Sequence, residues 1–161
     1  MIPPNLTVKS QEALRLAQET ALEYRHGTME PIHLLFGLLS QEEGLVPTLV
    51  KKIGINTAGL LEDIRAHFDR LPRHVQGGVA QNGLSSELVH VLQNKEKIAR
   101  TFKDEYISTE HLLLGLLDTP GLGGELKHIG MTEEAVLKVL KDVRGNTRVE
   151  SPEPEQGYQS L

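Results

Sequence analysis

The chain of 161 residues contains no cysteine and no tryptophan, and only 4% of its residues are aromatic. The missing cysteine excludes a disulfide-stabilised fold, cysteine-ligated zinc and thiol catalysis. The few aromatic residues offer little surface on which nucleic-acid bases could stack. The net charge is −5 and no block of Lys or Arg is present, so binding along a nucleic-acid backbone is not expected.

Long hydrophobic runs are also missing. The two most apolar stretches, residues 34–39 and 112–117, are far shorter than the roughly 20 residues that a transmembrane helix needs. The N-terminus has neither the basic region nor the apolar region of a signal peptide. We therefore expect a cytoplasmic protein without a membrane partner.

Recognisable catalytic motifs are absent as well. The sequence has no phosphate-binding loop with a Lys-Ser/Thr end, no Gly-x-Ser-x-Gly turn and no His-Glu-x-x-His motif. Its seven histidines show no spacing typical of metal ligands. We therefore expect no catalytic residue, no metal and no cofactor in this segment, which favours a binding role over an enzymatic one.

An internal repeat is the strongest positive feature of the chain. Residues 31–39 match residues 109–117 at a spacing of 78 positions, so that His33 falls on His111. The same register relates Leu14 to Leu92, Ala21 to Ala99, and Met29 to Ile107. A register that is kept over several segments indicates that the chain arose by duplication.

Each half of the chain is expected to form four helices. Apolar residues recur with a period near 3.6, and alternating patterns typical of strands are hard to find. Side chains suited to capping stand at the expected helix starts, namely Thr7, Asn56, Ser85, Ser108 and Thr132. Gly27 is placed to end the first helix. The sequence thus predicts an all-α domain over residues 1–145, with eight helices in two pseudo-symmetric four-helix repeats.

The repeats are expected at about residues 6–72 and 84–145. Residues 73–83 join them and are rich in Gly and Gln, which is typical of an exposed loop. Residues 146–161 combine prolines and glutamates without an apolar period, so we expect a flexible linker. A chain that ends within a linker suggests a continuation beyond it.

Two groups of polar residues allow a functional or a structural interpretation. His33 and His111 could be acid–base or metal-binding groups, but duplication of a helix-start histidine explains both copies more simply. Asp104 and Glu110 could form an acidic rim beside an apolar groove. Alternatively, Glu110 merely complements the positive end of a helix dipole.

Three stretches carry a resemblance to a known family: residues 6–7, 30–35 and 104–114. They resemble the N-terminal domain of the Clp unfoldases, which is a double Clp-N repeat, and the match extends over about residues 6–145. The Glu-Pro-x-His-Leu form at residues 30–34 and the Arg-Gly-Asn run at 144–146 are most similar to the disaggregating ClpB type.

The resemblance implies a domain tethered to a homohexameric AAA+ ring, whose ATP- and Mg-binding modules would lie beyond Leu161. In that family the domain binds unfolded or aggregated polypeptide and passes it to the ring. The family's substrate-groove residues match Thr7, Asp104 and Glu110. We expect weak binding, because a disordered client loses conformational entropy on docking. The isolated domain is expected to be monomeric, with adaptor proteins or co-chaperones as further partners.

Two alternatives remain open at this point. The domain could recognise adaptors or phosphoarginine, as in ClpC and ClpA relatives, where a Glu in each repeat helps to hold the guanidinium. Only Glu110 fits that pattern, because Ile32 stands at the equivalent place in the first repeat. The domain could also be a purely structural helical scaffold.

Overall fold

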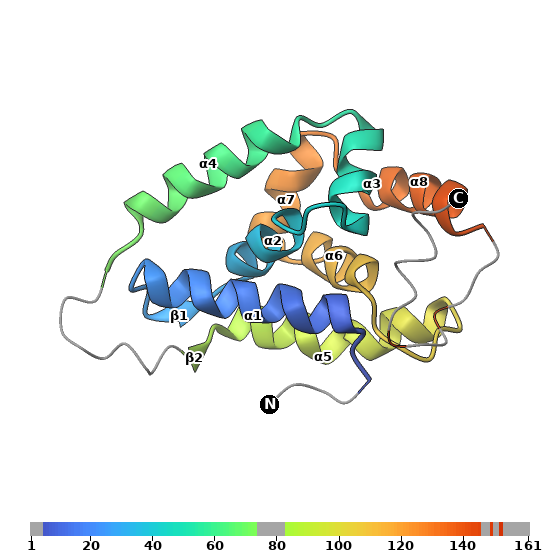
Figure 1. Ribbon diagram of the computed structural model, residues 1–161, viewed down its shortest axis with the longest axis horizontal. Helices are drawn as coiled ribbons and strands as arrows, with labels where there is room; N and C mark the ends of the chain where they lie inside the picture. The colour runs from blue at the N-terminus through green and yellow to red at the C-terminus, as the bar shows by residue number, and fades with distance from the viewer. Residues whose placement is uncertain (1–4, 74–82, 146–148, 150–151, 153–161) are drawn as a thin grey trace.

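The computed structural model describes residues 5–73, 83–145, 149 and 152, and the fold within these residues is all-α (Figure 1). The helices are α1 (Val8–Glu23), α2 (Pro31–Leu39), α3 (Leu45–Ile53), α4 (Thr57–Arg70), α5 (Ser86–Thr101), α6 (Thr109–Leu117), α7 (Pro120–His128) and α8 (Glu133–Arg144). Two short strands, β1 (Thr28–Met29) and β2 (Gly83–Leu84), complete the fold. The predicted fold class and the eight helices are confirmed. Most of the predicted loop and linker lies outside the described residues.

Four helices begin at the caps that the sequence predicts. The side chains of Thr7, Asn56, Ser85 and Thr132 each accept the backbone amide three residues later. Such a bond satisfies one of the amides that a helix start leaves without an intrahelical partner. These caps place the starts of α1 and α5 at equivalent positions of the two repeats.

The end of α1 differs from the prediction. The helix stops at Glu23, and the left-handed conformation after it falls on Arg25, with φ of 58°, rather than on Gly27. Lys103 repeats this after α5, also with φ of 58°. Gly54, with φ of 103°, ends α3 as predicted. The conformation at Arg25 and Lys103 was not foreseen because residues other than glycine rarely adopt it.

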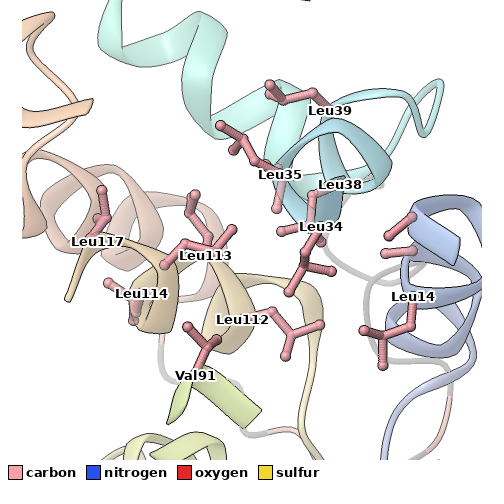
Figure 2. Packing of buried hydrophobic residues seen from close by; sticks show 14 of the residues in the cluster. Leu14, Leu34, Leu35, Leu38, Leu39, Val91, Leu112, Leu113, Leu114 and Leu117 are labelled. Carbon is pink, nitrogen blue, oxygen red and sulfur yellow. The ribbon is translucent and has the colours of Figure 1, made fainter. Parts of the chain in front are cut away.

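Helices α2 and α6 form the centre of the core. All nine residues of α6 are buried, as are seven of the nine in α2. Figure 2 shows Leu34 of α2 lying near Leu112 of α6, and both belong to the hydrophobic core. Gly37 lets α1 lie directly on α2, since a Cβ at this position would be only 2.4 Å from the carbonyl oxygen of Ala13.

Two short parallel pairings link the repeats. Met29 in β1 pairs with Leu84 in β2, and Leu6 forms an isolated bridge with Ile107. The amide of Ser85 donates to the carbonyl of Met29, and the amide of Thr7 donates to that of Ile107, both at 3.0 Å. The pairings are reciprocal, because the residues before each repeat's first helix bond to the other repeat.

Candidate functional site

A groove of about 520 Å³ lies between α1 and α5, the first helices of the two repeats. Figure 1 shows these helices running alongside each other. The groove is lined by Val8, Gln11, Glu12, Leu14, Arg15, Gln18, Met29, Leu84 and Leu92. Because the lining comes from both repeats, the groove exists only where the duplicated halves meet.

The base of the groove is apolar. Leu14 and Leu92, which are equivalent positions of the two repeats, face it from α1 and α5. Met29 and Leu84 contribute from the paired strands. Val8 and Leu84 are each 45% exposed, which is high for large hydrophobic side chains. Apolar surface gathered in a concave site is typical of a binding site for other apolar groups.

The rim of the groove is polar but has no dominant charge. Gln11 and Gln18 provide amides, while Glu12 and Arg15 provide one charge of each sign. Arg15 forms an exposed ion pair with Glu19 at 2.8 Å. Such a rim offers hydrogen bonds to a bound backbone without favouring a strongly acidic or basic ligand.

Thr7, the first predicted site residue, is completely buried. Its hydroxyl accepts the Ser10 amide at 3.2 Å and donates to the Ser10 hydroxyl at 3.1 Å. Ser10 in turn donates to the carbonyl oxygen of Ile107 at 2.9 Å. Thr7 therefore fixes the start of α1 and ties it to the second repeat.

Asp104 is also buried, and three groups hold its carboxylate. Oδ2 accepts from His111 Nε2 at 2.7 Å, and Oδ1 accepts from Arg144 Nη2 at 2.7 Å and from the Val149 amide at 2.8 Å. Burial alone would raise the pKa of Asp104, but the bonds from His111 and Arg144 lower it to about 2. The carboxylate is thus charged and internally satisfied.

Glu110 shares the same arginine. Its Oε2 accepts from Arg144 Nη1 at 3.3 Å, and its side chain is completely buried. Among the described residues, Glu110 Oε1 has no hydrogen-bond partner. The acidic rim that one interpretation of the sequence allowed is not part of this groove's surface, because the carboxylates of Asp104 and Glu110 face Arg144 inside the protein.

The three predicted residues nevertheless come together around Ile107. Thr7 bonds to its backbone, Asp104 lies three residues before it and Glu110 is the second residue of the helix after it. Thr7 is bonded to Ser10 and the two carboxylates are bonded to Arg144, all inside the protein, whereas the groove is lined by other residues. In the sequence, Leu14 and Leu92 stand out only as equivalent positions of the two repeats. That equivalence was the one signal that could have placed them together.

The paired histidines are helix-start residues, as the simpler interpretation predicted. His33 Nδ1 accepts the Glu30 amide at 2.8 Å, and His111 Nδ1 accepts the Ser108 amide at 2.9 Å. His33 Nε2 bonds to His26 Nδ1 at 2.8 Å. Burial lowers the pKa of His26 and, together with the nearby His26 ring, lowers the pKa of His33 to about 4.

Two features are absent from the residues that the structure describes. No group of three or more His, Cys, Asp or Glu side chains in this part of the chain is placed to hold a metal ion. Within the same residues, no helix has both the length and the apolar character that crossing a bilayer requires.

Comparison with known proteins identifies the family. Residues 5–129 match the Clp repeat N-terminal domain. The chain belongs to this family. Over 161 residues it is 35% identical to the chaperone protein ClpB of Clostridium perfringens, covering 97% of this chain and 19% of that protein. The Clp N-domain described here therefore spans about a fifth of the length of the curated relatives it matches.

Solved structures share the fold. The Hsp104 N-terminal domain from Candida albicans superposes with a TM-score of 0.81 at 22% identity, covering 94% of this chain and 99% of that one. A ClpV N-domain solved in complex with a VipB peptide gives a TM-score of 0.60 at 19% identity, with 86% and 78% of the two chains covered.

Proposed function

We propose that this Clp N-domain is a non-catalytic module that weakly binds exposed apolar segments of unfolded or aggregated polypeptide in the groove between α1 and α5. It would serve a ClpB-type, ATP-dependent disaggregase of the cytoplasm and hand the client to a homohexameric AAA+ ring. ATP and Mg would be bound in modules beyond residue 161. The similarity to ClpB chaperones supports this parent protein.

The single observation that carries the proposal is the exposed apolar groove at the repeat interface. Val8 and Leu84 remain 45% exposed there, above the buried side chains of Leu14 and Met29. A client that docks loses conformational entropy, so one domain binds weakly and releases readily. Six tethered domains in a ring would raise the effective concentration of binding sites.

Thr7, Asp104 and Glu110 enter the proposal as positioning residues. Because their side chains are buried, Thr7 would influence client binding by holding the start of α1 against Ile107, and Asp104 and Glu110 would do so by holding the segment around Ile107 to Arg144. Val8, the first residue of α1, lines the groove. Loss of Thr7 would therefore alter one end of the groove without removing a direct contact to the client.

The proposal is tested by a pair of substitutions at equally exposed leucine and isoleucine side chains. Leu84 lines the groove, whereas Ile129, at the end of α7, does not, and both are 45% exposed. We expect Leu84→Ser to weaken binding of a reduced, carboxymethylated globular protein in an NMR titration and Ile129→Ser to leave it unchanged. Equal binding by both variants would contradict the proposed groove.

The alternative function is recognition of an adaptor or a phosphoarginine mark, as in ClpC- and ClpA-type proteins. The ClpV N-domain bound to a VipB peptide favours a role in binding specific peptides. Against a phosphoarginine site, Arg144 already pairs with both Asp104 and Glu110. Calorimetric titration with free phosphoarginine separates the two functions, since saturable heat would support the alternative.

A further inference from the structure

The two pairings that link the repeats are built alike but differ in exposure. Leu6 pairs with Ile107 in one of them. The equivalent residues Leu84 and Met29 pair in the other. Leu6 and Ile107 are 1% and 0% exposed, whereas Leu84 is 45% exposed. The second pairing is therefore uncovered, and it is the one that contributes its side chains to the groove.

Beside the covered pairing, backbone amides are bonded to two residues from the end of the chain. The carbonyl of Val149 accepts the amides of Glu105 and Tyr106 at 2.8 and 3.2 Å. The carbonyl of Pro152 accepts the Val8 amide at 2.8 Å. The side chain of Val149 is completely buried in the hydrophobic core. Main-chain bonds combined with a buried apolar side chain are typical of a bound extended segment.

The uncovered pairing offers backbone donors at the equivalent places. At the spacing of the repeat, Gly27 corresponds to Glu105. Ser86 likewise corresponds to Val8. Among the residues that the structure describes, the amides of Gly27 and Ser86 have no acceptor. Ser86 is the first residue of α5, where an amide has no partner within the helix. Both donors therefore remain available beside Leu84.

The backbone that presents these donors follows the same path in both repeats. Arg25 and Lys103, two residues before the first donor of each repeat, both have φ of 58°. The amide that follows each of them bonds to the carbonyl five residues earlier, at 2.9 Å in the first repeat and 3.0 Å in the second. Ser85 and Thr7, directly before the other donor, both bond across to the partner repeat at 3.0 Å. The donors beside the two pairings are thus equivalent in structure as well as in sequence.

We propose that a client binds the groove as an extended segment whose backbone carbonyls accept the amides of Gly27 and Ser86. This inference rests on the proposed function and names the ligand class of the same site. The class is an extended chain with an apolar side chain that covers Leu84. Because the amides bond to backbone atoms, the site accepts many client sequences that share this one feature.

The first repeat lacks one acceptor that the second repeat has. Asp104 Oδ1 accepts the Val149 amide at 2.8 Å. His26, at the equivalent position, has both ring nitrogens bonded, Nδ1 to His33 and Nε2 to the carbonyl of Phe68. The client is therefore held by its carbonyls and its apolar side chain but not by an amide of its own, which agrees with weak binding.

The test removes one donor and keeps the helix. Ser86→Pro deletes the amide at the first position of α5, where proline is well tolerated. Pro31 and Pro120 already stand at this position in α2 and α7. We expect a reduced, carboxymethylated globular protein to bind Ser86→Pro roughly fivefold more weakly than Ser86→Ala, which loses the same hydroxyl but keeps the amide. Glu133→Pro, at the first position of α8, is the matched control and should bind like the unsubstituted chain.

Equal binding by Ser86→Pro and Ser86→Ala overturns the inference, and so does a comparable loss in Glu133→Pro. Should Ser86→Pro fail to fold, hydrogen exchange on the unsubstituted chain decides. We expect the amides of Gly27 and Ser86 to exchange more slowly once the client saturates the NMR shift of Leu92. Unchanged exchange at Gly27 and Ser86, together with weaker binding by Leu84→Ser, overturns this inference and leaves the proposed function standing. No shift at Leu92 overturns both.

Discussion

Asp104 occupies in the second repeat the position that His26 occupies in the first. Each stands seven residues before the helix-start histidine of its repeat and bonds to the Nε2 atom of that ring, at 2.7 Å to His111 and 2.8 Å to His33. The repeats therefore differ in chemistry, because this position is His in the first repeat and Asp in the second. The first contains a neutral pair of imidazoles, whereas the second contains a carboxylate that also binds Arg144.

Acid should destabilise the domain through His33. Burial and the His26 ring hold the pKa of His33 down to about 4, while the unfolded chain binds its proton near pH 6.5. The stabilising contribution is therefore complete above pH 6.5 and is lost as the pH falls toward 4. We expect this group to lower the free energy of unfolding by on the order of 3 kcal/mol at pH 4, measured by urea denaturation.

The histidine responsible can be identified with two variants. His33→Asn should flatten the pH dependence between 6.5 and 4, because the buried titrating ring is gone. His90→Gln should leave it unchanged, since His90 is exposed on α5. A profile that is the same for both variants would assign the acid sensitivity to another group.

Removal of Arg144 should be severe. The variant Arg144→Met leaves the buried carboxylates of Asp104 and Glu110 without their shared cation, which costs about 3–5 kcal/mol in comparable sites. Arg15→Met removes the exposed pair with Glu19 and should change the free energy of unfolding little. Thermal and urea denaturation of both variants measure the difference, and similar losses would contradict a role for burial.

The same network predicts a second acid transition. Hydrogen bonds from His111 and Arg144 outweigh burial and lower the pKa of Asp104 to about 2, below its unfolded value of 3.8. Its stabilising contribution is therefore present above pH 3.8 and is lost as the pH falls toward 2. Arg144→Met should weaken this step, because much of the stabilisation of the charged carboxylate is removed. An unchanged transition in unfolding experiments below pH 4 would assign it elsewhere.

Local chemistry explains why the helices could be predicted from the sequence. A cap such as Asn56 or Thr132 bonds to a backbone amide three residues later, and a left-handed glycine such as Gly54 ends the helix directly before it. The duplication was visible for the same reason. His33 and His111 each accept a hydrogen bond from the backbone amide three residues earlier, at the starts of α2 and α6. These features need no knowledge of the tertiary fold.

The parts that could not be predicted depend on distant contacts. The pairing of Leu6 with Ile107 involves single residues and leaves no alternating pattern. Asp104 and Glu110 looked like surface acids, because the sequence does not show that Arg144 reaches them from α8. Val149 lies in a segment whose composition is that of a linker, yet its side chain is buried. In each case a residue far along the chain decides the environment.

Loss of the Thr7 cap should affect both stability and client binding. Thr7→Ala removes the acceptor for the Ser10 amide and should cost about 1 kcal/mol, whereas Thr7→Ser keeps it. Thr132→Ala removes an equivalent cap from α8. We expect only the first of these losses to weaken client binding in an NMR titration, because α1 lines the groove and α8 does not. Weaker binding by Thr132→Ala would point to a general effect of stability.

Two equivalent glycines should respond differently to a methyl group. A Cβ at Gly37 would lie 2.4 Å from the carbonyl oxygen of Ala13, so α1 and α2 must separate. At Gly115 the nearest atom is a Val91 methyl carbon at 3.2 Å, which can move aside. We expect Gly37→Ala to cost about 3 kcal/mol in urea unfolding. Gly115→Ala should change stability by less than about 1 kcal/mol, because the gain in helix propensity offsets the crowding. Equal losses would mean that α5 and α6 pack as tightly as α1 and α2.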